Sequence, residues 1–238
     1  MPDFAEIWSY LESGPLIWLS ATLIAYLIGD AIFRASGRRP FANPVLIAMI
    51  LLAILLRSTH TAYATYFEGA KFVHFMLGPA TVALSVPLFA NLGRLRKSAL
   101  PLLAALFVGS LTAMGSAIAI GWALGLRGET LISLTPKSAT APVALGISES
   151  IGGSPTLTAV LVILTGIIGA ITVTPLLNLL RVRDWRARGF AVGVAAHGIG
   201  SARAFQVNET AGAFAGIGMG LNAILTAILA PIIAGWVF

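Results

Sequence analysis

The sequence predicts an all-α, polytopic transmembrane protein. Of its 238 residues, 58% are hydrophobic and only 10% are charged, whereas about 25% are charged in an ordinary soluble domain. The apolar residues form long uncharged runs, including 29 residues between Lys97 and Arg127 and 31 between Glu149 and Arg181. A helix needs about 20 apolar residues to cross the hydrocarbon core. The runs lack the alternation of a membrane β-barrel, so we expect one helical membrane domain over residues 1–238.

The apolar runs predict about seven spans, at residues 15–33, 41–56, 71–92, 98–125, 155–180, 187–206 and 208–237. The stretch from Glu129 to Gly153 is different, because it contains Lys137, Glu149 and two prolines. Such a segment is too polar to face lipid. We expect it to be re-entrant, so that it enters and leaves the membrane on the same side.

The basic residues predict an orientation. Ten of the fifteen Lys and Arg residues lie in three short loops, at residues 34–39, 94–97 and 181–188. Basic loops remain in the cytoplasm, and a re-entrant 129–153 segment brings all three loops there. This predicts a protein of the bacterial inner membrane with its N-terminus outside and its C-terminus inside. The acidic start, with Asp3 and Glu6, lacks the basic region of a signal peptide, so the first run is expected to be a retained span.

The same topology predicts an inverted repeat, in which residues about 41–125 correspond to residues about 130–238.

Composition excludes other classes of protein. Cysteine is absent, which rules out disulfides and thiolate metal sites. The sequence has no phosphate loop, metal-ligand cluster or nucleophile motif, so neither an enzyme nor a cofactor is expected. The formal charge of +6 lies in loops, where it sets orientation and does not indicate nucleic-acid binding.

Three segments interrupt the apolar runs with residues that disfavour helix: 78–81, 136–142 and 197–203. Proline and glycine unwind helices, and unwound backbone is tolerated at membrane depth only inside protein or beside a wet cavity. In transporters, half-helix N-termini at such interruptions face anionic substrates. We therefore expect a substrate site at the interruptions, although the Gly-Pro pair at 78–79 is also compatible with a simple kink.

Two cations near these interruptions predict a carboxylate site. The planar guanidinium of Arg203 suits a bidentate carboxylate, and hydroxyl residues flank Lys137. The alternative for Arg203 is an internal ion pair with Glu149 or Glu209, or a position at the membrane interface. The expected substrate-binding residues are Lys137, Ser138, Thr140, Pro142, Gly198, Gly200, Ser201, Arg203, Pro79, Thr81 and Asn43.

Proton coupling is assigned to His197 or Glu149. The reference pKa of histidine suits such a role, and the alternative for His197 is a structural hydrogen bond. Glu149 is equally compatible with pairing to Lys137. Asn43 precedes a proline and is also compatible with capping a helix.

Several ordered strings resemble the LrgB family, from about Leu16 to the end of the chain. They are the segments 136–144, 151–159, 165–170, 187–191 and 196–204. The sequence departs from the family pattern at Ala139, Ala141 and Ser201, where Val, Thr and Thr are expected. The missing hydroxyl at residue 141 removes one polar contact from the expected site.

The resemblance implies two different functions. Bacterial members are described as holin- or antiholin-like regulators of murein hydrolase export, paired with a small LrgA-type membrane protein. The plastid relative is a glycolate/glycerate translocator, and pyruvate is implied for some bacterial pairs. With the predicted site, this favours a proton-coupled transporter of small monocarboxylates; the alternative is a pore-forming or regulatory protein that controls autolysis. An LrgA-like partner and a homodimer through the Gly-rich face at 212–216 are further expectations.

Overall fold

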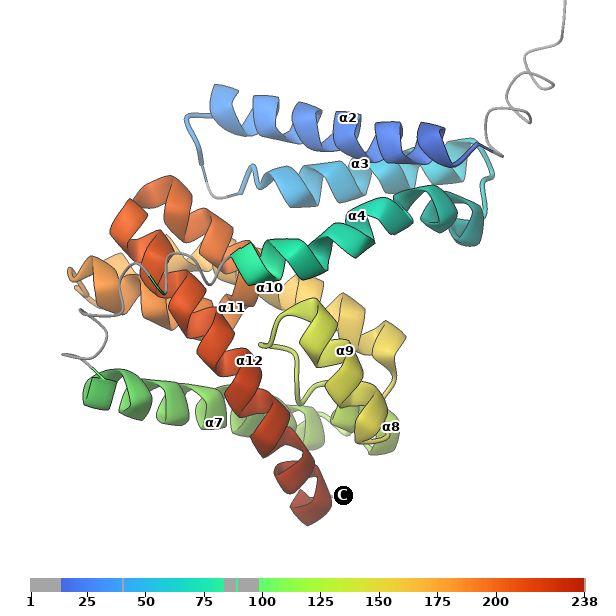
Figure 1. Cartoon of the computed structure of the whole chain (residues 1–238). Coiled ribbons are helices and arrows are strands. Elements are labelled where there is room, and N and C mark those ends of the chain that lie inside the picture. Colours follow the sequence, from blue (N-terminus) through green and yellow to red (C-terminus); the bar gives the residue numbers. More distant parts are fainter. Residues whose placement is uncertain (1–13, 40, 84–88, 90–98, 238) are drawn as a thin grey trace, which may run out of the picture. The chain divides into compact units, whose positions relative to one another are not determined.

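The computed structural model describes residues 14–39, 41–83, 89 and 99–237, and within them it contains helices and no strand (Figure 1). The helices are α2 (Pro15–Ala35), α3 (Pro44–Ser58), α4 (Tyr63–Ala83), α7 (Ala99–Ala123), α8 (Gly128–Ser133), α9 (Ala141–Ser150), α10 (Pro155–Leu179), α11 (Trp185–Val207) and α12 (Glu209–Val237). Four of the described helices, α2, α7, α10 and α12, are long and apolar enough to cross a membrane. The expectation of an all-helical fold is confirmed.

The chain forms two compact units, residues 1–80 and 81–238. In the first unit, α2 packs directly against the start of α3, because a Cβ at Gly29 would lie 2.5 Å from the carbonyl oxygen of Pro44. Trp18 is 1% exposed and meets Tyr66 of α4 edge to face, with ring centroids 5.9 Å apart. The predicted inverted repeat extends over both units and stays a prediction. The single membrane domain expected over residues 1–238 stays a prediction as well.

One predicted interruption is wrong. Residues 78–81 belong to α4, which continues as helix through an exposed Pro79. Membrane helices tolerate proline because their surroundings satisfy the freed backbone group. The helix also begins at Tyr63, well before the expected residue 71. The side chain of Thr81, and residues 84–88 and 90–92 of the predicted 71–92 span, lie outside the described residues.

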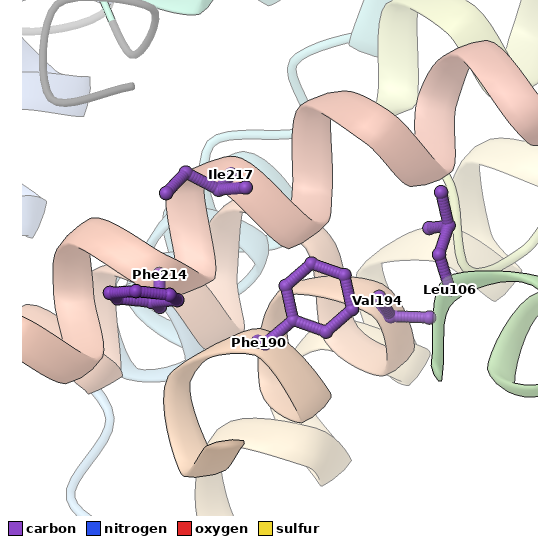
Figure 2. Packing of buried hydrophobic residues seen from close by; sticks show 5 residues of the cluster. All are labelled: Leu106, Phe190, Val194, Phe214 and Ile217. Carbon is purple, nitrogen blue, oxygen red and sulfur yellow. The ribbon is translucent and has the colours of Figure 1, made fainter. Parts of the chain in front are cut away.

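In the second unit, α7 and α12 run parallel to each other. Leu106 in α7 belongs to one buried cluster with Phe214 and Ile217 of α12 and with Phe190 and Val194 of α11, which Figure 2 shows. The other halves of α7 and α12 also meet, through Met114 and Ala230. α10 runs the opposite way, because it begins beside α8 and ends beside the start of α11.

The predicted re-entrant stretch is a helical hairpin, residues 128–150, which we call the first hairpin. Its arms are α8 and α9, joined by the turn at 134–140 (Figure 1). Buried hydroxyl groups join the last residue of α8 and the end of α9 to the start of α10. Thr158 Oγ1 donates to the Ser133 carbonyl oxygen at 3.0 Å and lies 2.7 Å from Ser148 Oγ, whose hydroxyl can donate to it, and Ser154 N donates to Ser133 Oγ at 2.8 Å.

α11 is also a hairpin, residues 185–207, which we call the second hairpin. The backbone leaves helical geometry at Ala196 (φ −132°, ψ 19°) and His197 (φ 41°, ψ −138°). In a straight helix Trp185 and Val207 would lie about 33 Å apart, yet both line one cleft of about 20 Å³. A Cβ at Gly200 would lie 3.1 Å from Val192 Cγ2. The two arms therefore lie side by side.

The predicted crossing span at 187–206 is thus wrong, and so is part of the predicted topology. The first arm of the second hairpin runs parallel to α12, since a Cβ at Gly189 would collide with Ala211 and one at Gly193 with Ala215. We call the end of the second unit where α10 ends and α12 begins the arginine end. The 181–188 loop lies at this end and the C-terminus lies at the other, whereas the sequence predicted both on one side.

Candidate functional site

The turn of the first hairpin lies at the middle of the long helices. Asn222 Nδ2 donates to the Ser138 carbonyl oxygen at 3.1 Å, and Ser110 Oγ donates to Asn222 Oδ1 at 2.5 Å. Asn222 is the fourteenth of 29 residues in α12, and Ser110 is the twelfth of 25 in α7. All three residues are buried. The tip of the first hairpin is therefore fixed about halfway along α7 and α12.

The tip of the second hairpin reaches the same region from the arginine end. His197 Nε2 lies 2.8 Å from the carbonyl oxygen of Val162 in α10. A carbonyl only accepts hydrogen bonds, so Nε2 carries the proton. Val162 also packs against Ala139 and Ala144 of the first hairpin. Two hairpins that start from opposite ends thus bring their tips together.

Two glycines in α10 form the surface against which the tip of the second hairpin packs, which we call its seat. A Cβ at Gly166 would lie 2.6 Å from His197 Cε1, and one at Gly169 would collide with Ala196. His197 itself has a positive φ of 41°, and its φ and ψ are close to those of the first central residue of a type II′ turn, where glycine is strongly preferred. Such a conformation costs about 1–3 kcal/mol in another residue and is concentrated at functional sites. The next residue, Gly198, is the type that this conformation favours. The turn nevertheless places His197, and not Gly198, in the strained position.

The tips are electropositive. Lys137 is half-buried, and its Nζ lies 3.4 Å from Ser138 Oγ. α9 begins at Ala141, with Thr140 as an N-cap that makes no side-chain capping bond, and the second arm of α11 begins after His197. Helix N-termini carry partial positive charge and free N–H groups. The acidic residues described in the second unit all lie exposed, away from the tips: Glu129, Glu149, Asp184 and Glu209.

Other predicted site residues near the tips have structural contacts. Ser201 is buried and its Oγ donates to the His197 carbonyl oxygen at 2.8 Å. Gly200 allows the two arms of the second hairpin to approach. Gly198 has room for a side chain, because a Cβ there would lie 3.8 Å from Met219 Sδ. Pro142 lies in the first turn of α9 and is exposed.

The structure places three predicted residues elsewhere. Arg203 is six residues beyond His197, about 9 Å along the helix, and lines the cleft of the second hairpin together with Arg188. Glu149 is exposed at the outer end of α9. Asn43 caps α3 in the first unit, where its Oδ1 accepts from the N–H groups of residues 45 and 46 at 2.9 and 3.2 Å. The helix-start interpretation of Asn43 is confirmed.

Sequence reasoning missed Asn222, the residue that joins three elements at the tips. One signal was present: Asn222 is the only amide side chain in the uncharged run from Thr210 to Phe238. A polar side chain inside a membrane span commonly marks a functional position. Its partners Ser110 and Ser138 lie 112 and 84 residues away in the chain, so no local pattern could identify them.

The match with known proteins extends over nearly the whole chain. Residues 22–236 match the LrgB-like family. The chain belongs to this family. It is 34% identical over 223 residues to YxaC of Bacillus subtilis (strain 168), covering 94% of this chain and 96% of the relative. It is 32% identical over 217 residues to a protein of Bacillus mycoides (strain KBAB4) named antiholin-like protein LrgB, covering 91% of this chain and 94% of the relative.

The family identification confirms the resemblance seen in the sequence, and this chain is a multi-pass membrane protein of the LrgB-like family. A third relative, YwbG of Bacillus subtilis (strain 168), is 34% identical over 216 residues, covering 91% of this chain and 96% of that protein. No solved structure matches the chain.

Proposed function

We propose that this protein transports small monocarboxylates of the glycolate, glycerate or pyruvate type. The observation that supports this most is the meeting of two hairpin tips halfway along the spans, with Lys137 and His197 in the two tips. Interrupted helices that meet near the middle of a membrane are typical of secondary transporters. The carboxylate is bound by Lys137 Nζ and by the N–H groups at the start of α9 and of the second arm of α11.

Charge favours an anion at this site. Lys137 and two helix N-termini contribute positive charge, while the described carboxylates of the second unit lie exposed. A cation at membrane depth is costly unless a counter-charge offsets it. A bound carboxylate supplies that counter-charge, whereas a neutral solute does not.

The two hairpins are re-entrant and give access from opposite sides of the membrane. The first hairpin has its base at the end where α7 finishes, and the second has its base at the arginine end. Movement of either tip away from Val162 opens the junction toward its own side. This arrangement provides the two gates that alternating access requires.

His197 couples a proton to the anion. Lys137 lies in the turn of the first hairpin, two residues from the Ala139 that packs against Val162, the hydrogen-bond partner of His197. A second positive charge on the His197 ring is therefore repelled by Lys137. A carboxylate bound between the two groups offsets this repulsion. Proton and anion therefore bind more tightly together than either binds alone, which is the condition for symport.

The arginine end faces the cytoplasm of the inner membrane. Four Arg residues lie in the loop at 181–188, whereas Arg127 is the basic residue in the loop between α7 and α8 at the other end. The positive-inside rule then puts the C-terminus outside. This reverses the C-terminal position expected from the sequence, since α12 crosses from the arginine end to the other end.

Counterflow with purified protein in liposomes tests this function. The wild type is expected to give saturable exchange of two- to four-carbon monocarboxylates. Lys137→Ala removes a charged hydrogen bond, generally about 1.5–3 kcal/mol, so the KM should rise about 10- to 150-fold. Lys71→Ala is the matched control, because Lys71 is an exposed residue of the first unit that pairs with Glu68 at 2.5 Å. Equal uptake by both variants contradicts the carboxylate site.

The names of relatives favour a second candidate, an antiholin-like regulator of autolysis. A pore of that kind releases solutes of several sizes from the same liposomes, without saturation or competition. If the protein is such a regulator, an LrgA-like membrane protein is its expected partner. A homodimer through the face at 212–216 is disfavoured, because a Cβ at Gly212 would collide with the Phe205 ring and most of that face is already buried inside the chain.

A further inference from the structure

The second hairpin has a narrow cleft at its base, toward the arginine end. The cleft holds about 20 Å³. It is lined by Val173, Thr174, Leu177, Trp185, Arg188, Val192, Arg203, Ala204, Val207 and Ala211. Two of these residues are arginines and none is acidic. The first arm supplies Arg188 and the second supplies Arg203, so the reversal at His197 brings the two cations to one cleft.

We infer that this cleft binds the phosphate of an anionic phospholipid. Two guanidinium groups beside one opening suit an oxyanion with several acceptor oxygens. The volume is the decisive constraint, because about 20 Å³ holds little more than one water-sized group. A whole organic acid does not fit. A lipid phosphate that stays outside the cleft can insert one oxygen between the arginines.

The surroundings of the cleft fit a lipid. Val207 lines the cleft and is exposed, and Leu176, the neighbour in sequence of the lining residue Leu177, is exposed as well. Acyl chains can cover these two side chains. Trp185 lies under Arg188, whose guanidinium carbon is 4.7 Å from the ring centroid, and tryptophan is typical of the headgroup region. Basic pockets between membrane helices are known to bind anionic headgroups.

The charge of the neighbouring loop is also favourable. Residues 181–188 contain four Arg and one Asp. Asp184 pairs with Arg186 at 2.7 Å, and this hydrogen bond lowers the pKa of Asp184 to about 2. Its carboxylate is therefore engaged by Arg186 at any physiological pH. The other three arginines give the loop a net positive charge that attracts an anionic membrane surface.

A lipid bound here joins the two arms of the second hairpin at their base. It is separate from the junction of the tips, so this inference goes beyond the proposed transport function. Its effect is to stabilise the hairpin in anionic membranes. Thermal unfolding of detergent-purified protein measures this directly, with phosphatidylglycerol or phosphatidylcholine added in parallel samples.

We expect phosphatidylglycerol to raise the Tm by about 3–6 °C at a tenfold excess over its dissociation constant, and phosphatidylcholine to have little effect. Arg188→Gln and Arg203→Gln should each abolish the rise. Arg127→Gln is the matched control and should keep it, since Arg127 is an exposed arginine over a tryptophan, Trp122, at 5.0 Å, at the opposite end of the unit. Glycerol phosphate without acyl chains should give no comparable rise.

Three results would overturn the inference: a phosphatidylglycerol rise retained in Arg203→Gln, an equal rise with phosphatidylcholine, or an equal rise with soluble glycerol phosphate. If Arg203→Gln does not fold, Thr174→Phe decides the question, because it fills the cleft and leaves both arginines in place. Retention of the rise in that variant contradicts the site. None of these measurements involves transport, so their failure is distinguishable from failure of the proposed function.

Discussion

Replacement of His197 by glycine and by alanine tests the turn of the second hairpin. Both variants lose the imidazole, its hydrogen bond to Val162 and its packing against Gly166, so they differ by one methyl group. In an ordinary helix, alanine is more stable than glycine by about 1 kcal/mol. At φ 41° and ψ −138° the order reverses, because a side chain there costs about 1–3 kcal/mol that glycine avoids.

The size of the reversal follows from two opposing effects. The greater freedom of its unfolded chain lowers the stability of the glycine variant by about 0.4–1 kcal/mol, which leaves it more stable than the alanine variant by about 1.3 kcal/mol at the middle of these ranges. For a protein of this length, 1 kcal/mol corresponds to about 2–4 °C in Tm. His197→Gly should therefore melt about 3–5 °C above His197→Ala in the same detergent.

Ala202→Gly provides the control, because Ala202 is exposed in the second arm of the same hairpin. It should lower the free energy of unfolding by about 1 kcal/mol relative to the wild type. The reasoning is refuted if His197→Ala is at least as stable as His197→Gly, because residue 197 would then not have the positive φ that forms the turn of the hairpin. Both variants should also lose the proton dependence of uptake.

Three further predictions follow from contacts in the second unit. Asn222→Leu leaves the Ser138 carbonyl and the Ser110 hydroxyl without their partner, which costs about 1–3 kcal/mol for each group. Chemical denaturation should show that the free energy of unfolding falls by several kcal/mol. A fall of less than about 1 kcal/mol would contradict this hydrogen-bond network. Gly166→Ala puts a methyl group against the His197 ring and should lower the free energy of unfolding by about 1–3 kcal/mol. A Tm equal to that of the wild type would mean that the tip of the second hairpin does not pack against α10. Asp184 is the N-cap of α11 and accepts a hydrogen bond from the N–H of residue 186 at 2.8 Å. Asp184→Ala should therefore lower the free energy of unfolding by about 1 kcal/mol, whereas Asp184→Asn, which keeps a capping oxygen, should lower it little. Equal losses of stability in the two variants would contradict the cap.

The pKa of Asp184 sets the pH dependence of its exposed ion pair. The folded pKa is lowered from 3.8 to about 2 by hydrogen bonds from Arg186. Any stability from this carboxylate is therefore present above about pH 4 and is lost as the pH falls toward 2. We expect Asp184→Asn and the wild type to show the same change in Tm between pH 5 and pH 8; a difference in that interval would contradict the assignment.

Local sequence patterns predicted the helices and the first hairpin. Uncharged runs located α7, α10 and α12 to within a few residues, since the bilayer requires apolar length. Pro136 and Pro142 marked the turn of the first hairpin, because proline interrupts helical hydrogen bonding. The glycines at 198 and 200 identified an interruption close to its true position.

The reversal of α11 was beyond sequence reasoning. A broken crossing helix and a hairpin share the same apolar pattern and the same glycines. The difference lies in the dihedral angles of His197, a residue with a side chain, and in the seat provided by Gly166 and Gly169 of another helix. For the same reason, the sequence assigned Arg203 to the substrate, whereas the hairpin carries it back toward Arg188.

Protection of an introduced thiol by substrate tests most directly whether the junction of the two tips binds a carboxylate. The chain has no cysteine, so Thr140→Cys, at the start of α9, gives a single reporter at the first tip. Gly146→Cys, on an exposed and open part of the same helix, is the control. A transported monocarboxylate at saturating concentration should slow alkylation at residue 140 several-fold and leave residue 146 unchanged. An unchanged rate at residue 140, in a variant that still transports, would contradict a carboxylate site between the hairpins.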